Sequence, residues 1–218
     1  MLKLFNKCIL VGVLSVLAGC ATQKFSTGDP SPATVIQPAA IVKDYSDYAA
    51  LGLVNVDADF QNKFALALHA IKKKQTSKAE TQLDQLISQR PDLVTPLYNR
   101  AVLAQSESQM ELAFELFAKA HFIDPANTRV CNAYGRALRL EGEFQKAKEV
   151  YETCLSFEDQ SPVVHKNYGI LLDLYLQTPQ IALKQYQAYL SKTPVEDRRV
   201  KGWVVDLERR LQAKEAQR

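Results

Sequence analysis

Four polar side chains in the middle of the chain recur at intervals of three and four residues: Arg129, Asn132, Arg136 and Arg139. At this spacing they share one face of an α-helix. A guanidinium group pairs with a carboxylate through two parallel hydrogen bonds, and an amide adds further donors. The row therefore predicts a surface that binds a partner's acidic side chains or its free C-terminus. A solvated basic face without a ligand is the alternative that remains open.

No group of residues has the spacing of a catalytic or metal site. The three histidines, His69, His121 and His165, lie outside any HExxH pattern and away from paired carboxylates. The sequence also lacks the glycine-rich motifs that hold nucleotides and the GxSxG motif of hydrolases. We therefore expect a protein that is not an enzyme and that uses neither a metal ion nor a cofactor.

Cys20 is a second candidate for chemistry, because it ends the sequence LAGC (17–20). Two lysines precede an apolar run, Cys8 to Ala18, which is shorter than the roughly 20 residues that a membrane-spanning helix needs. This arrangement resembles the lipobox of bacterial lipoproteins. The resemblance implies a signal peptide over 1–19 and a lipid anchor on Cys20. Because Ala21 follows in place of an aspartate, it also implies the periplasmic face of the outer membrane. An ordinary signal peptide with an incidental cysteine is the alternative.

Composition gives no reason to expect nucleic acid as a partner. The 218 residues include 27 Lys and Arg against 24 Asp and Glu, so the chain is nearly neutral. Residues 20–59 contain a stretch rich in Pro, Ser, Thr, Ala and Gly without helical periodicity, which is typical of a tether. We expect the lipidated N-terminus and its flexible tether in this segment, with a single folded domain after it.

Small residues recur with a period of 34 residues, at Ala67, Ala101, Gly135 and Gly169. A second series has the same period, but its last member comes one residue late: Ala79, Ala113, Ala147 and Ala182. An aromatic residue and a proline of the last copy show the same delay. One inserted residue near Gln177–Pro179 explains these late positions.

A 34-residue period with small residues, an aromatic residue and a closing proline resembles the tetratricopeptide repeat (TPR), in which each copy is a pair of antiparallel helices. The resemblance implies an all-α fold, namely a short TPR solenoid of about four helix-turn-helix repeats. The copies span 60–93, 94–127, 128–161 and 162–195. Residues 196–218 predict an amphipathic capping helix and tail, which covers the last layer of such a solenoid.

Pairs of a hydroxyl residue and a proline predict helix starts, because the hydroxyl oxygen can cap the helix and proline suits its first position. These pairs are Thr95-Pro96, Ser161-Pro162, Thr178-Pro179 and Thr193-Pro194. Thr193 and Glu196 also have the spacing of a capping box, so the capping helix is expected to begin there.

The TPR resemblance implies that the first helix of each pair lines a concave groove. The basic row of the third copy then faces this groove, and the neighbouring copies add Tyr98, Asn99, Val102, Lys166, Asn167 and Ile170. Some TPR domains clamp a C-terminal carboxylate in this way. Asn99 and Arg129 match that pattern, but Phe64, Leu68 and Ala133 stand at its other positions, so the clamp itself is not expected.

Cys131 and Cys154 are the cysteines that remain after cleavage of the signal and lipidation. Antiparallel helices that meet at Gly135 and Ala147 bring the two cysteines toward each other. A disulfide in an oxidising periplasm and a pair of buried free thiols are both compatible with this placement.

Over residues 60–195, and in its signal, the chain resembles bacterial TPR lipoproteins. The resemblance implies a lipid-anchored periplasmic adaptor that binds a segment of a partner protein. This family includes pilotin-like lipoproteins of pilus and secretion systems, so pilus or secretin assembly is the specific expectation. It also includes lipoproteins that recruit peptidoglycan hydrolases. Such recruitment, or a structural link between outer membrane and wall, is the alternative.

Overall fold

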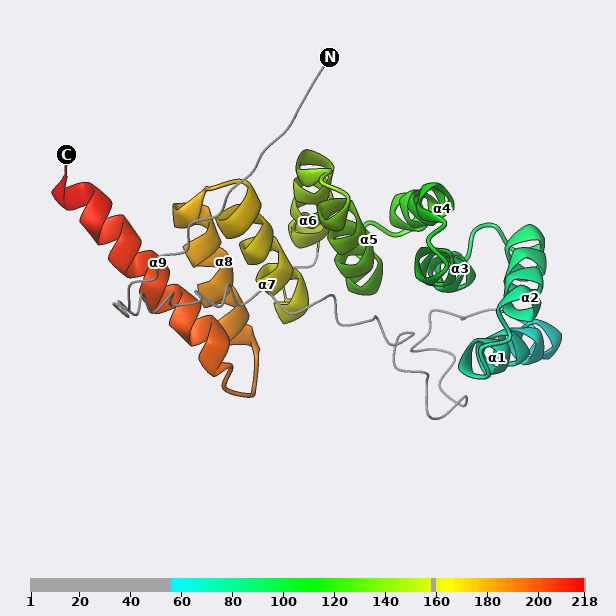
Figure 1. Ribbon diagram of the computed structural model, residues 1–218. Coiled ribbons are helices and arrows are strands. Elements are labelled where there is room, and N and C mark those ends of the chain that lie inside the picture. The colour runs from blue at the N-terminus through cyan, green and yellow to red at the C-terminus, as the bar shows by residue number, and fades with distance from the viewer. Residues whose placement is uncertain (1–55, 158–159, 218) are drawn as a thin grey trace, which may run out of the picture. The chain divides into compact units, whose positions relative to one another are not determined.

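Every regular element is helical in the computed structural model, which describes residues 56–157 and 160–217 (Figure 1). The helices are α1 (Ala58–Lys72), α2 (Thr76–Gln89), α3 (Val94–Ser106), α4 (Met110–Ile123), α5 (Thr128–Leu140), α6 (Phe144–Phe157), α7 (Pro162–Ile170), α8 (Pro179–Lys192) and α9 (Arg198–Ala216). A π-helical segment, η1 (Leu171–Tyr175), continues α7. The predicted signal peptide, Cys20 and nearly all of the predicted tether lie outside the described residues.

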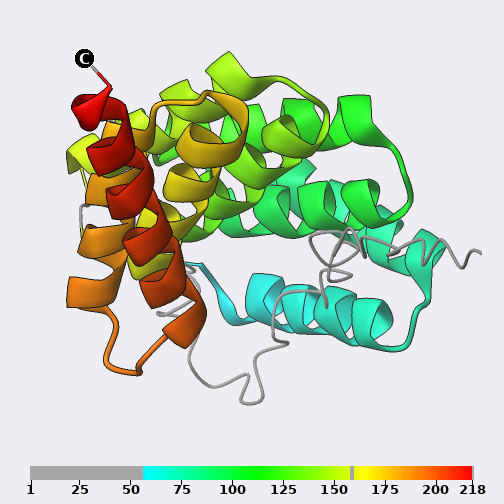
Figure 2. The same ribbon diagram turned by 60° about the vertical axis from the view of Figure 1, so that its left-hand side comes forward.

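Consecutive helices form antiparallel pairs, as Figures 1 and 2 show for α3 with α4 and for α5 with α6. Each pair packs against the next one along the chain, and α9 packs on α8. This arrangement confirms the prediction of an all-α fold with four helix pairs and a C-terminal helix. None of these helices combines the length and the apolar character that crossing a membrane requires.

The small residues of the 34-residue period lie where the two helices of a pair touch. Ala67, Ala79, Ala101, Ala113, Ala147 and Ala182 have no exposed surface. Gly135 and Gly169 have a more specific reason to be small. A Cβ atom on Gly135 would lie 2.5 Å from Cζ of Tyr151, and one on Gly169 would lie 2.5 Å from Cε1 of Tyr186. The glycines thus make room for two tyrosine rings.

In the second copy a smaller aromatic side chain, phenylalanine, packs at the equivalent place. Ala101 is sixteen residues before Phe117, as Gly135 is before Tyr151, and both Ala101 and Phe117 are fully buried. Phenylalanine has no hydroxyl group, so its ring needs less space at the tip than tyrosine does. The choice between alanine and glycine in each copy therefore follows the side chain that packs on it.

The inserted residue of the fourth copy lies in η1, not in the turn at Gln177–Pro179 where the sequence placed it. The amide of Leu176 donates to the carbonyl of Leu171, five residues back, over 3.0 Å. A π-turn of this kind accommodates one extra residue inside a helix. The turns themselves keep their form, because each has a left-handed residue at the equivalent place: Lys74, Ser108, Gly142 and Gln177. The extra residue must therefore precede Gln177.

Two helix starts differ from the sequence prediction. Helix α3 begins at Val94, so Thr95 lies in its first turn and is buried. Helix α9 begins at Arg198, and the carboxylate of Asp197 accepts from the amides of Arg199 and Val200, each over 3.1 Å. Asp197 provides the cap in place of the expected capping box, because a carboxylate directly before the helix can accept two amide hydrogens at once.

Ser161 and Thr178 do stand directly before α7 and α8, and a proline follows each of them as predicted. Neither side chain makes a capping hydrogen bond among the described residues. The hydroxyl of Thr178 donates instead to the carbonyl of Leu172 over 3.3 Å.

Candidate protein-binding site

Helix α5 carries the basic row that the sequence singled out. The side chain of Asn127 caps the helix by accepting from the amide of Val130 over 3.3 Å. One face of α5 is buried and apolar, whereas Arg136 and Arg139 are half-buried and Arg129 is exposed. The apolar face thus docks the helix on the core and leaves its basic residues on the other side.

Helices α3 and α7 flank this row. Burial raises the pKa of Tyr98 on α3, and the nearby charges of Arg129 and Arg136 partly offset that rise. On the other side, the amide group of Asn167 on α7 donates to the side-chain oxygen of Asn132 on α5. The structure therefore places Asn132 and Asn167 in contact, and it places Tyr98 where the charges of Arg129 and Arg136 act on it.

Arg139 has an aromatic partner that the sequence analysis did not assign to the site. Its Nη1 donates to the hydroxyl of Tyr175 over 3.2 Å, and its guanidinium carbon lies 5.4 Å from the centre of the Tyr175 ring. The ring of Tyr175 in turn lies 4.8 Å from that of Phe144. Tyr175 is the last residue of η1, which takes up the inserted residue of the fourth copy. The one-residue delay in that copy is therefore the feature of the sequence that marks this part of the surface.

Arg136 and Arg139 supply positive charge that the described residues do not neutralise. In the part of the chain that the structure describes, no aspartate or glutamate forms an ion pair with Arg136 or Arg139. Nε of Arg139 is buried and lacks a hydrogen-bond acceptor among these residues. Arg136 and Arg139 can therefore bind a carboxylate from outside the fold.

The fold and this surface can be compared with known proteins. Residues 128–160 match the tetratricopeptide repeat family. A solved structure entitled "Functional Characterization of Pseudomonas Aeruginosa pilF" superposes with a TM-score of 0.60 at 22% identity, covering 71% of this chain and 69% of that one. The fold is that of a TPR protein. MamA from Desulfovibrio magneticus (residues 41 to its end) gives a TM-score of 0.59 at 13% identity, with coverages of 73% and 89%.

A thermophilic TPR protein from Thermus thermophilus gives a TM-score of 0.53 at 19% identity, with coverages of 73% and 86%. No curated protein sequence matches the chain significantly. At these identities the structural similarity establishes the TPR fold alone, so the site must be argued from its own residues.

Besides Asn132 and Asn167, three further predicted binding residues already have partners inside the protein. Val102 is only 8% exposed and belongs to an apolar cluster. The side-chain amide of Asn99 donates to the carbonyl of Thr95 in its own helix over 2.8 Å. Lys166 donates to Asp197 over 2.7 Å. Helical spacing shows which face a residue occupies, but it does not show which neighbour already uses the side chain.

Lys166 thus forms part of the junction with α9. Its Nζ lies 4.9 Å from the ring centre of Tyr189 and 6.0 Å from that of Trp203. The hydrogen bond from Lys166 is the main cause that lowers the pKa of Asp197 to about 2. Ile170, the remaining predicted residue of α7, is half-buried against the adjacent core.

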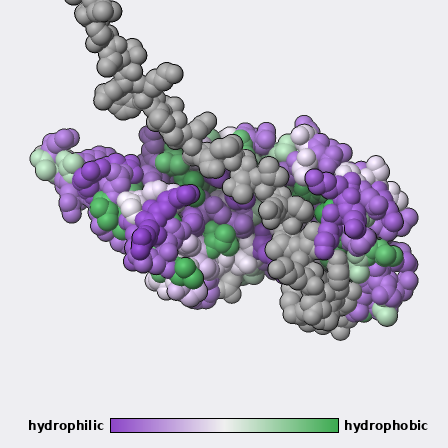
Figure 3. All heavy atoms as spheres, turned by 60° about the horizontal axis from the view of Figure 1, so that its bottom comes forward, coloured by the Kyte–Doolittle hydropathy of each residue, from purple (hydrophilic) through white to green (hydrophobic). Residues whose placement is uncertain are grey.

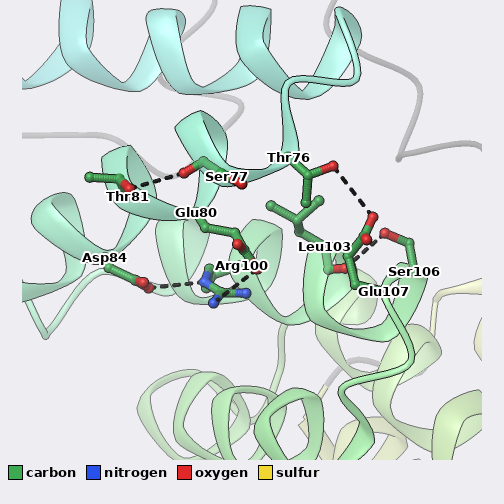
Figure 4. A network of polar contacts seen from close by, with 9 residues as sticks. All are labelled: Thr76, Ser77, Glu80, Thr81, Asp84, Arg100, Leu103, Ser106 and Glu107. Carbon is green, nitrogen blue, oxygen red and sulfur yellow. Dashed lines mark hydrogen bonds and ion pairs between the residues drawn. The ribbon is translucent and has the colours of Figure 1, made fainter.

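Arg100 is a buried charged residue that the sequence analysis did not single out. Its side chain is 7% exposed and extends from α3 toward α2, where Nε donates to Asp84 over 3.0 Å and Nη2 lies 3.3 Å from Glu80 (Figure 4). Thr76, also on α2, donates to Glu107 over 3.4 Å. These polar contacts join the first two helix pairs, and no local pattern in the sequence indicates them.

The structure joins Cys131 of α5 to Cys154 of α6 in a disulfide, with the Cα atoms 6.1 Å apart. Both cysteines are fully buried. His121 lies beside them, with Nδ1 4.0 Å from Sγ of Cys131, and burial lowers the pKa of this histidine. In the described part of the chain, no three His, Cys, Asp or Glu residues are placed to hold a metal ion.

Proposed function

We propose that the protein is a binding scaffold that holds a segment of a partner protein on the surface formed by α3, α5 and α7. The observation that carries the proposal is the pair Arg136 and Arg139, two half-buried cations with no carboxylate partner among the described residues. A TPR fold supports the same function, because stacked helix pairs form extended surfaces for binding other proteins. The partner segment is then one that bears carboxylates.

We further propose that the scaffold is anchored by lipid on Cys20 to the periplasmic face of the outer membrane, as the LAGC sequence favours. A role in pilus or secretin assembly is the finest part of this proposal. It is supported by the lipobox resemblance together with the fold shared with PilF.

The binding surface is tested by crosslinking in cells from a photoreactive residue at position 98, followed by identification of the captured protein. Arg136→Glu places a negative charge where the partner's carboxylate is expected, so we expect partner capture to weaken by about 2 kcal/mol, or roughly thirtyfold. Lys119→Glu is a matched control, because it makes the same charge change on α4, which is the second helix of its pair and not one of the helices that form the proposed surface. Both variants should melt close to the wild type.

Capture that is unchanged in folded Arg136→Glu would place the binding surface elsewhere. The anchor has its own test: Cys20→Ala should leave a slower-migrating, uncleaved precursor that takes up no labelled palmitate and does not fractionate with the outer membrane. A labelled Cys20→Ala variant would contradict the lipid anchor. Secretin multimers that form normally in cells without the protein would exclude the role in secretin assembly.

A further inference from the structure

The turn between α1 and α2 carries four lysines within seven residues: Lys72, Lys73, Lys74 and Lys78. We call these four residues the lysine turn. All of them are exposed, and none forms an ion pair with a carboxylate in the part of the chain that the structure describes. Hydrophilic residues cover most of the right-hand end of the molecule in Figure 3, which is the end where Figure 1 places α1 and α2.

Backbone hydrogen bonds fix the conformation of the lysine turn. The amides of Lys74 and Gln75 donate to the carbonyls of Ile71 and Ala70, each over 2.9 Å, and Lys74 has a left-handed φ of 56°. The amide of Ala79 donates to the carbonyl of Gln75 over 3.0 Å, at the start of α2. An ordered backbone therefore presents the four charges together at one end of the first helix pair.

Helix stability accounts for only part of this charge. The first two lysines lie at the C-terminal end of α1, where a positive charge interacts favourably with the helix dipole. Lys78 lies in the first turn of α2, where the same interaction is unfavourable. The nearest carboxylates of α2 do not offset its charge, because Glu80 and Asp84 both bind Arg100. A negatively charged partner would relieve the repulsion between the lysines.

The equivalent turns of the next two copies carry the opposite charge. Lys73, Glu107 and Glu141 are 34 residues apart, and each stands directly before the left-handed residue of its turn. Thr76 donates to Glu107 over 3.4 Å, so the first two turns lie side by side (Figure 4). The sign of the charge thus reverses from the first copy to the second and third. A negatively charged surface attracts the lysine turn and repels the two turns that follow it.

Two features favour a lipid surface over a protein as the partner. Lysine is a flexible point charge that suits diffuse negative charge, whereas arginine has the paired donors that match a single carboxylate. The lysine turn contains no arginine. Residues 21–55 join α1 to the proposed anchor at Cys20, and a flexible chain of this length spans about 30–35 Å on average. The first copy is therefore the one that the anchor holds nearest to the bilayer.

We propose that the lysine turn binds the anionic phospholipid headgroups of the membrane that carries the anchor. The inference rests on the lipid anchor of the proposed function, because the anchor raises the local concentration of lipid at the turn. A lipid chain and a basic patch act together in stable membrane binding. The contact sets how the scaffold stands on the bilayer: the first copy faces the lipid, and α3, α5 and α7 of the later copies stay available to the partner segment.

The contact is tested with a chain that begins at residue 21 and carries no lipid, so that the anchor plays no part. This chain keeps the described fold, because the buried residues of the three apolar clusters all lie between Phe60 and Leu207. It is sedimented with vesicles of two parts phosphatidylcholine to one part phosphatidylglycerol, and with vesicles of phosphatidylcholine alone. We expect binding to the anionic vesicles only, and its loss in about 1 M salt, where charges are screened within about 3 Å. No binding to anionic vesicles at low salt would overturn the proposal.

Two variants separate the lysine turn from the net charge of the chain. The first changes all four of its lysines to glutamine, a residue that forms helices as well as lysine does. We expect vesicle binding to weaken at least about a hundredfold, because each lysine near an anionic surface contributes about fivefold. The control removes the same charge from four exposed lysines on other helices: Lys119→Gln, Lys146→Gln, Lys184→Gln and Lys214→Gln. It should bind within about fivefold of the unsubstituted chain. Unchanged binding of the first variant, or an equal loss in both, would overturn the proposal.

Crosslinking in cells decides between lipid and other acidic partners. A photoreactive residue in place of Ser77, which is exposed within the lysine turn, should form adducts with phospholipid. Capture of an acidic protein or of the cell wall in place of lipid would overturn the proposal.

The failure of this inference and the failure of the proposed function give different results. If the vesicles are not bound, but Arg136→Glu weakens partner capture and Cys20 takes up palmitate, the lipid contact is wrong while the proposed function stands. If Cys20→Ala is still labelled, the anchor fails, and the vesicle experiment alone decides whether the lysine turn binds anionic lipid.

Discussion

Replacing Gly135 by alanine tests whether this glycine is present because Tyr151 packs on it. The added Cβ would lie 2.5, 2.6 and 2.9 Å from Cζ, Cε1 and Cε2 of Tyr151, whereas carbon atoms in contact prefer about 3.5–4.0 Å. The ring is fully buried, with the ring of Tyr168 centred 5.8 Å away. It therefore cannot move by about an ångström without displacing its neighbours.

Two opposing contributions set the change in the free energy of unfolding that Gly135→Ala causes. Overpacking of a buried site costs about 1–3 kcal/mol, and alanine gains about 1 kcal/mol over glycine inside a helix. With three ring atoms too close, we take the upper end of the cost and expect Gly135→Ala to lower the free energy of unfolding by about 2 kcal/mol. This corresponds to a fall in Tm of about 4–8 °C for a chain of this length.

The assay is thermal and urea unfolding of a mutant cycle. Tyr151→Phe alone should stay within about 1 kcal/mol of the wild type, since it removes a hydroxyl without a partner among the described residues. Gly135→Ala with Tyr151→Phe reproduces the alanine and phenylalanine of the second copy and tests the hydroxyl by itself, because phenylalanine keeps the three ring carbons that the added Cβ would meet. A coupling of at least about 1 kcal/mol in favour of the double variant would show that the hydroxyl holds the ring against Gly135. Gly202→Ala is the control, because its Cβ would meet nothing within 4 Å, and it should be slightly more stable than the wild type.

A Gly135→Ala variant as stable as Gly202→Ala would refute the packing argument. A double variant whose loss equals the sum of the single losses would show that the tyrosine hydroxyl is not the reason for glycine at this position.

The remaining predictions concern an ion pair, a disulfide and a buried charge. Because the pKa of Asp197 is lowered from 3.8 to about 2, its stabilising effect is full above 3.8 and is lost as the pH falls through about 2. The fluorescence of the single tryptophan measures this loss, which should be smaller in Asp197→Asn, a variant that keeps the helix cap. The bond between Cys131 and Cys154 predicts no free thiol from this pair in denatured, unreduced protein; its removal should cost about 3 kcal/mol, and two titratable thiols would contradict it. Arg100→Ala should destabilise the fold by about 2 kcal/mol, because it removes a buried side chain and leaves the partly buried carboxylate of Glu80 without its ion pair, whereas Arg90→Ala breaks a fully exposed ion pair and should cost clearly less; equal losses in urea unfolding would refute this distinction.

Much of the architecture can be predicted from the sequence, because the same local pattern of residues recurs in each repeat. The 34-residue period identifies the helix pairs, and small residues at fixed places mark where the helices of each pair touch. Stacked repeats contact mainly their neighbours, so a short-range pattern is enough to indicate the fold. The helical spacing of Arg129, Arg136 and Arg139 likewise places them on one face, which the structure of α5 shows.

Only the tertiary structure decided which of these side chains are available. Lys166 and Asp197 are 31 residues apart, and Arg100 and Asp84 are 16 apart. Their pairing depends on how one helix is rotated against the next, and no periodic pattern contains that rotation. The place of the inserted residue was decided in the same way, because the turn at Gln177 keeps the form of the earlier turns and η1 takes up the extra residue. Local spacing determines the face on which a residue lies, whereas packing between helices determines which partner it meets there.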